Sequence, residues 1–182
     1  ARTSDATGKW SEIGLPPDSN YRITVTKAGY STDRTYPVAT YPSALAPDAT
    51  VLDGEITQTT FLIDKLSNLT LKVQDQLCQP IEGISVNVAG AKQISPGLPK
   101  FDNDYTSSST GTIIPTTTSS CSSTCNSINC CLESDTYTPT MSDTNYMIYG
   151  TSPIQEVNIL PDASQSFSLI LGPKTAGSLL AV

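Results

Sequence analysis

The sequence predicts an all-β protein built from antiparallel β-sandwiches. Apolar and polar residues alternate over short runs, notably Tyr21–Val25, Leu69–Val73, Ile84–Val88 and Ser166–Leu169. Turn sequences rich in Pro, Gly and Asp separate these runs, and no segment shows a convincing 3.6-residue period. Many short alternating strands divided by frequent turns are typical of a sandwich.

The N-terminal third is expected to hold two strand regions around a long loop. Tyr21–Val25 alternates apolar with polar residues and follows a Pro-Pro-Asp turn, so it predicts a half-buried strand. The loop Tyr36–Thr50 contains three prolines and few charges, which favours an extended excursion. The run Val51–Asp64 then ends in the strand-like sequence Thr60–Ile63.

The remaining elements follow in order. Leu69–Val73 and Ile84–Val88 flank a connection with Asp, Pro and Gly, so we expect them to form a β-hairpin. Strand-like sequence returns at Thr136–Thr138 and again over Val157–Leu171, with a Leu-Pro-Asp turn inside the latter.

The chain repeats one pattern. Val51 and Val157 lie 106 residues apart, and so do Phe61 and Phe167. A repeat of this length indicates two related domains rather than a solenoid, whose units are about 20–50 residues long. We therefore predict domains at residues 1–66 and 67–173, followed by a tail at 174–182. Only the second copy has a full opening section, Leu69–Gly90, so the first is expected to lack its leading strands.

Two explanations account for such a shortened first copy. The chain is either a fragment that begins inside a domain, or its exposed edge is completed by a strand from a neighbour. Within the chain, Ala1–Thr7 and Leu179–Val182 are the candidate donor strands.

Composition and charge favour an extracellular or cell-surface protein. Hydrophobic residues make up 37% and charged residues only 15% of the chain, below the roughly 25% typical of globular domains. The net charge of −7, without a basic cluster, argues against nucleic-acid or anionic-lipid partners. No apolar run reaches the roughly 20 residues of a membrane helix, so no membrane contact is expected within this chain. The chain has no histidine, which argues against hydrolytic catalysis, and no catalytic residue, metal site or cofactor is predicted.

Five cysteines are candidates for disulfide bonds: Cys78, Cys121, Cys125, Cys130 and Cys131. In an extracellular protein, four cysteines within 11 residues favour local disulfides. Because five is odd, at least one is free, modified or paired with another chain. The alternatives are a four-thiolate metal site, whose spacing departs from the usual pattern, and reduced cysteines.

A polar loop precedes and includes part of this cluster. From Thr106 to Thr124, 14 of 19 residues are Ser or Thr, which favours an exposed or extended segment. An O-glycosylated or adhesive loop is the sharper alternative, and residual strand is a third. The candidate glycosylation or contact residues are Thr116, Thr117, Thr118, Ser119 and Ser120.

The second copy resembles the carboxypeptidase regulatory-like domain. The resemblance rests on Leu69–Asp75, Pro80–Val88, Ser109–Gly111, Asp135–Tyr137 and Phe167–Leu171. It implies a seven-stranded, transthyretin-like (Ig-like) sandwich of the kind common in bacterial surface proteins, without catalytic residues. Some related surface sandwiches form a Lys–Asn or Lys–Asp isopeptide bond. Lys72 lies in a suitable strand but on its polar side, so we do not expect such a bond here.

A narrower resemblance is to bacterial surface proteins with prepilin-type N-termini. It rests on Gly29–Tyr36 before the Pro-rich loop, on Asp135–Tyr137 and on Tyr149–Pro153. The pilin helix itself is absent from this sequence. The resemblance implies a pilus or pseudopilin context.

Together these observations predict a non-catalytic structural subunit or module of a bacterial cell-surface appendage, such as a filament or adhesin shaft. The expected partners are further copies of the chain or other appendage subunits. One alternative is an adhesion module that binds carbohydrate or a host protein. Another is an accessory domain of a secreted enzyme.

Overall fold

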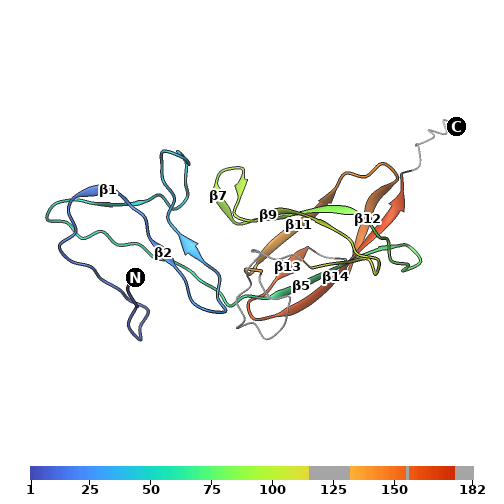
Figure 1. Ribbon diagram of the computed structural model, residues 1–182, viewed down its shortest axis with the longest axis horizontal. Helices are drawn as coiled ribbons and strands as arrows, with labels where there is room; N and C mark the ends of the chain where they lie inside the picture. The colour runs from blue at the N-terminus through green and yellow to red at the C-terminus, as the bar shows by residue number, and fades with distance from the viewer. Residues whose placement is uncertain (115–131, 155, 175–182) are drawn as a thin grey trace.

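The computed structural model describes residues 1–114, 132–154 and 156–174, and within these ranges the secondary structure is entirely β (Figure 1). The all-β prediction is therefore confirmed. The strands are β1 (Asp18–Tyr21), β2 (Thr24–Val25), β3 (Asp33–Arg34), β4 (Ala49–Val51), β5 (Asn68–Asp75), β6 (Ser85–Gly90), β7 (Gln93–Ser95), β8 (Leu98–Pro99), β9 (Asp102–Thr106), β10 (Thr112–Ile113), β11 (Asp135–Met141), β12 (Tyr146–Ser152), β13 (Val157–Ile159) and β14 (Ser164–Pro173).

Residues 67–173, called the C-terminal sandwich below, contain two four-stranded sheets. One has the strand order β10-β5-β14-β12 and the other β13-β11-β6-β9. Pairing is antiparallel except between β14 and β5, which run parallel over eight residue pairs from Ser164↔Asn68 to Leu171↔Asp75. The small hairpin β7–β8 projects from the second sheet toward the N-terminal part of the chain (Figure 1).

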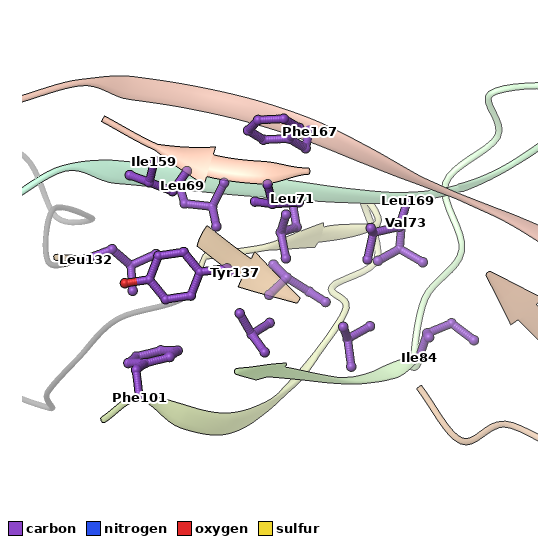
Figure 2. Packing of buried hydrophobic residues seen from close by; sticks show 14 of the residues in the cluster. Leu69, Leu71, Val73, Ile84, Phe101, Leu132, Tyr137, Ile159, Phe167 and Leu169 are labelled. Atoms are coloured by element: carbon purple, nitrogen blue, oxygen red, sulfur yellow. The ribbon is translucent and has the colours of Figure 1, made fainter. Parts of the chain in front are cut away.

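The hydrophobic core fills the space between these two sheets (Figure 2). Leu69, Leu71 and Val73 of β5 are fully buried, and they face Val86 and Val88 of β6 in the opposite layer. Burying one such side chain contributes about 1.5–3 kcal/mol. The full cluster is Leu69, Leu71, Val73, Ile84, Val86, Val88, Phe101, Ile113, Leu132, Tyr137, Val157, Ile159, Phe167, Leu169 and Leu171.

The predicted hairpin between Leu69 and Gly90 is wrong, because β5 and β6 belong to different sheets. After β5 the chain turns back beside its own strand, where Ile81 N donates to Val73 O at 3.0 Å. Gly83, with a φ of 78°, then directs the chain across to the second layer. The connection is long enough to span the roughly 10 Å between packed sheets. The apolar faces of both strands are buried against one core in this arrangement, as their alternation requires.

Residues 1–66, called the N-terminal segment below, form two small ribbons, β1–β4 and β2–β3. None of the residues in the hydrophobic cluster comes from this segment. Its buried side chains are mainly polar, and Thr35 is 1% exposed. The Thr35 hydroxyl donates to Asp48 Oδ1 at 2.8 Å and accepts from Ile23 N at 2.9 Å. This polar network adjoins the two buried apolar residues of the segment, since Tyr36 follows Thr35 and Ala49 follows Asp48 in the sequence.

Two strand predictions in this segment need correction. Tyr21–Val25 is divided between β1 and β2, with Arg22 and Ile23 outside both strands. Only Val51 of the run Val51–Asp64 is in a strand, and Thr60–Ile63 has no strand pairing. The alternation is still visible, because Phe61 and Ile63 are half-buried while Leu62 is 77% exposed. The run has the pattern of a strand but lacks the neighbouring strand that a ladder needs.

Candidate assembly site

The N-terminal segment and the C-terminal sandwich share a tyrosine arrangement. Tyr21 and Tyr137 lie 116 residues apart, as do Tyr30 and Tyr146. The Tyr21 hydroxyl donates to the Pro16 carbonyl, five residues upstream, at 2.8 Å. The Tyr137 hydroxyl donates to the Glu133 carbonyl, four residues upstream, also at 2.8 Å. Burial raises the pKa of Tyr137, whereas Tyr21 is only half-buried.

The strand pairings correspond as well. β1 pairs antiparallel with β4, placing Tyr21 opposite Ala49. β11 pairs antiparallel with β13, placing Tyr137 opposite Val157. The bridge between Tyr30 and Lys65 likewise corresponds to the β12–β14 pairing, in which Tyr146 lies opposite Pro173.

These pairings match the 106-residue repeat with a shift of two residues. In the repeat, Val51 is the counterpart of Val157, and the residue paired with Tyr21 is Ala49, two positions earlier. Likewise Ser67 is the counterpart of Pro173, and the residue bridged to Tyr30 is Lys65, two positions earlier. A shift of two residues keeps each side chain on the same face of its strand.

The two parts differ in what surrounds the last strand. β14 is paired with β12 on one side and with β5 on the other. Its counterpart, 106 residues earlier, is residues 58–67. There Ser31 N donates to Asp64 O at 2.7 Å, and Leu66 N donates to Gly29 O at 2.9 Å. Among the described residues, the backbone of Gln58–Ile63 forms no backbone–backbone hydrogen bond, and the Leu62 amide donates to Asp33 Oδ2 at 3.3 Å. Within residues 1–114, 132–154 and 156–174, no strand pairs with this segment as β5 pairs with β14.

The N-terminal segment also exposes many apolar side chains. Ile56 is 97% exposed, Ile13 90%, and Leu62 77%. The other large apolar residues exposed in this segment are Trp10, Leu15, Val38, Leu45 and Leu52. Isolated exposed apolar residues are ordinary on a protein surface. Leu62 lies within Gln58–Ile63, and Ile56 precedes it by two residues.

Asp64 connects the N-terminal segment to the C-terminal sandwich. Its Oδ2 accepts a hydrogen bond of 2.7 Å from Ser134 Oγ and lies 3.5 Å from Lys92 Nζ. The Ser134 hydrogen bond, which outweighs partial burial, and the Lys92 charge lower the pKa of Asp64. Asp64 Oδ2 therefore lies at the centre of a junction. Its two partners, Lys92 and Ser134, follow Asp64 in the sequence by 28 and 70 positions.

Glu133 places two lysines at this junction. Its carboxylate lies 2.8 Å from Lys92 Nζ and 2.8 Å from Lys100 Nζ, and its side chain is only 12% exposed. Burial alone lowers the pKa of Lys92, but the hydrogen bond and charge of Glu133, with Asp64, raise it overall. Buried carboxylates require such partners. The four side chains thus form one charge network.

Two further contacts join the two parts. Lys65 Nζ lies 2.7 Å from Asp162 Oδ2. Leu45 N, in the Pro-rich loop, donates to Ile94 O of β7 at 2.9 Å. The N-terminal segment therefore contacts the C-terminal sandwich at more than one place.

Lys72, the residue considered for an isopeptide bond, has its side chain exposed on β5. The closer arrangement for such chemistry is Lys92 with Asp64 and Glu133. Amide formation needs a neutral amine and a protonated acid, but Lys92 has a raised pKa and Asp64 a lowered one. This geometry favours an ion pair.

Cys78 is a free, exposed cysteine at the tip of the turn after β5. Asp75 Oδ1 accepts hydrogen bonds of 2.8 Å from the amides of Leu77 and Gln79, and Cys78 takes a φ of 61°. The other disulfide candidates (Cys121, Cys125, Cys130 and Cys131) lie outside the described residues. So do the candidate contact residues Thr116, Thr117, Thr118, Ser119 and Ser120, and these predictions remain open.

The junction was not predicted from the sequence. Asp64, Lys92, Lys100 and Glu133 are scattered over 70 residues and form no motif.

In the part of the chain that the structure describes, no group of three His, Cys, Asp or Glu residues could hold a metal ion, and no helix is long and apolar enough to cross a membrane. No protein-family model matches the chain, and no match was found among curated proteins or solved structures.

Proposed function

We propose that this chain is a non-catalytic structural module of a bacterial cell-surface appendage, and that it assembles through its N-terminal segment. The observation that carries the proposal is the unpaired backbone at Gln58–Ile63 beside exposed apolar residues such as Ile56 and Leu62. An unpaired strand-like edge favours association by strand addition.

The junction supports a mechanical role. The charge network of Asp64, Lys92, Lys100 and Glu133 connects the N-terminal segment to the C-terminal sandwich, and Lys65–Asp162 adds a second ion pair. A chain with its parts arranged end to end (Figure 1) and held at several points suits a shaft or filament, in which each subunit transmits force to the next. The Ser/Thr-rich, low-charge composition supports an extracellular location.

Electron microscopy and light scattering test this proposal. Native material and purified chain are imaged by negative stain, and the molar mass is followed over a hundredfold concentration range. We expect the purified 19.3 kDa chain to form regular oligomers or filaments. A discrete monomer at every concentration, absent from native filaments, contradicts the proposal.

An adhesion module that binds carbohydrate or protein is the second candidate. It is supported by exposed apolar residues at the far edge of the sandwich, where Tyr149 of β12 is 72% exposed, Met147 48% and Ile154 96%. An exposed aromatic ring is a common platform for ligands. A glycan array probed with the chain and with Tyr149→Ala separates this function from the structural one.

A further inference from the structure

We propose that residues 58–65 accept a parallel β-strand from a second polypeptide, and that this strand has the apolar–polar alternation of β5. The inference rests on the structural role proposed above. It names the partner by its chemistry: an extended segment of about eight residues with branched aliphatic side chains at alternate positions, as in Leu69, Leu71 and Val73.

The internal repeat identifies this partner. Phe61 and Ile63 stand 106 residues before Phe167 and Leu169 of β14. In the C-terminal sandwich, Phe167 lies opposite Leu71 and Leu169 opposite Val73 in the parallel ladder with β5. A β5-like strand beside the N-terminal segment would therefore place aliphatic side chains next to Phe61 and Ile63 on the same face.

Side-chain exposure supports this alignment. Phe167 is 2% exposed and Leu169 is fully buried. Phe61 and Ile63, their counterparts in the 106-residue repeat, are only half-buried. Leu62 matches Ser168 on the other face of the strand, and it is 77% exposed. The same inward and outward alternation is present in both parts, but among the described residues only the C-terminal sandwich has the neighbouring β5 strand.

The backbone gives a second, independent argument. Gln58–Ile63 has no backbone–backbone hydrogen bond to the described residues, and just beyond it the segment is held on one side by Ser31 and Gly29. These contacts hold the segment on the side where β12 pairs with β14, and among the described residues no backbone hydrogen bond is formed on the other side. Strand addition satisfies such groups, since unpaired backbone donors and acceptors are costly once water is excluded.

Peptide binding tests the proposal on the full chain. The probe is a fluorescent ten-residue peptide with the sequence of residues 67–76, titrated by anisotropy against monomeric protein. We expect saturable binding, and Phe61→Asp or Ile63→Asp weakens it by about tenfold or more, because a buried charge opposes docking. Leu62→Asp is the matched control and is expected to stay within about twofold. A peptide with Asp in place of both its second Leu and its Val is expected not to bind.

Two further measurements keep the result interpretable. Amide exchange at Ser31 and Leu66 shows whether each variant retains its native N-terminal segment, and exchange at 58–63 is expected to slow on binding. Photocrosslinkers at either end of the peptide test the orientation in which it binds. If the peptide binds parallel to residues 58–65, its N-terminal end crosslinks near Thr59 and its C-terminal end near Lys65.

Each outcome decides between the two proposals. Absence of binding, an antiparallel crosslink pattern, or equal effects of Phe61→Asp and Leu62→Asp overturns the strand-acceptor proposal. If copies of the chain associate through 58–65 and exclude the peptide, the occupant is a second copy and the β5-like partner is wrong. Filaments without peptide binding leave the structural role intact, whereas peptide binding without filaments supports the acceptor site alone.

Discussion

Ser134 Oγ donates a hydrogen bond of 2.7 Å to Asp64 Oδ2, joining residues that are 70 positions apart in the chain. The same carboxylate lies 3.5 Å from Lys92, and the Asp64 amide donates to Ser31 Oγ at 3.0 Å. Asp64 thus contacts the N-terminal segment through its backbone and the C-terminal sandwich through its side chain. Its substitution is the most direct test of how the two parts are coupled.

Asp64→Asn is expected to loosen the junction without unfolding the sandwich. The amide oxygen still accepts from Ser134, but the charge that faces Lys92 is lost. Because these side chains are partly exposed, we expect a loss of about 1 kcal/mol or less, visible as faster amide exchange at Ser31 and Leu66. Glu12→Gln is the control, since Glu12 pairs with Arg2 within the N-terminal segment. Equal exchange in both variants contradicts a coupling role for Asp64.

The junction is also expected to weaken in acid. The folded structure lowers the pKa of Asp64 from its ordinary value of 3.8, so its contribution is present above that pH and is lost as pH falls through the folded pKa. The pKa of Lys92 is raised from 10.5, so its contribution is present below 10.5 and lost only as pH rises through a higher value. The charge contribution is therefore constant between about pH 5 and 9.

Amide chemical shifts measure this directly. The shifts of Ser31 and Leu66 are expected to change with a midpoint below 3.8 in the native chain, and this step disappears in Asp64→Asn. Asp162→Asn, which removes the ion-pair partner of Lys65 at the same junction, serves as a second reference. A midpoint above 3.8 that is unaffected by Asp64→Asn assigns the transition to another group.

The sequence predicted the all-β class and most strands of the C-terminal sandwich because alternation is a local signal. Leu69, Leu71 and Val73 were expected on one face of a strand, and all three are buried. The sequence did not predict which strands pair. β5 and β6 are neighbours in the chain, yet β5 pairs with β14, which begins 96 residues after it. Pairing at that distance depends on how the apolar faces are buried together.

The sequence did not reveal the junction and wrongly predicted a strand at Thr60–Ile63 for two different reasons. The contacts of Asp64 and Glu133 join positions that no motif connects, so only the folded chain reveals them. Thr60–Ile63 has the composition of a strand, but a strand also requires a hydrogen-bonded neighbour. The repeat is visible at Phe61 and Phe167, but β14 has β5 and β12 beside it, whereas Gln58–Ile63 has no such neighbour among the described residues.

Thr35→Val is expected to destabilise the N-terminal segment selectively. Valine has nearly the same shape but leaves the Ile23 amide and Asp48 Oδ1 without the Thr35 hydroxyl. Losing a buried polar partner costs about 1–3 kcal/mol. We expect faster amide exchange at Tyr36 and Asp48, with unchanged protection in β5 and β14. Thr40→Val, on an exposed turn, is the control. A global loss of protection shows instead that the two parts unfold together.

Gly111→Ala is expected to destabilise the C-terminal sandwich more than Gly97→Ala does. Both glycines have positive φ angles, 67° and 78°, so alanine adds about 1–2 kcal/mol of backbone strain at either position. At Gly111 the new Cβ also clashes with the Val73 carbonyl oxygen and approaches Pro80, whereas at Gly97 it meets nothing within 4 Å. Val73 N donates to Gly111 O at 2.6 Å, so relieving the clash disturbs the β5–β10 edge. Denaturant unfolding of the two variants separates strain from clash. Equal losses mean that the chain beside β5 yields at no cost, while a larger loss at Gly111 shows that close backbone approach is what requires glycine there.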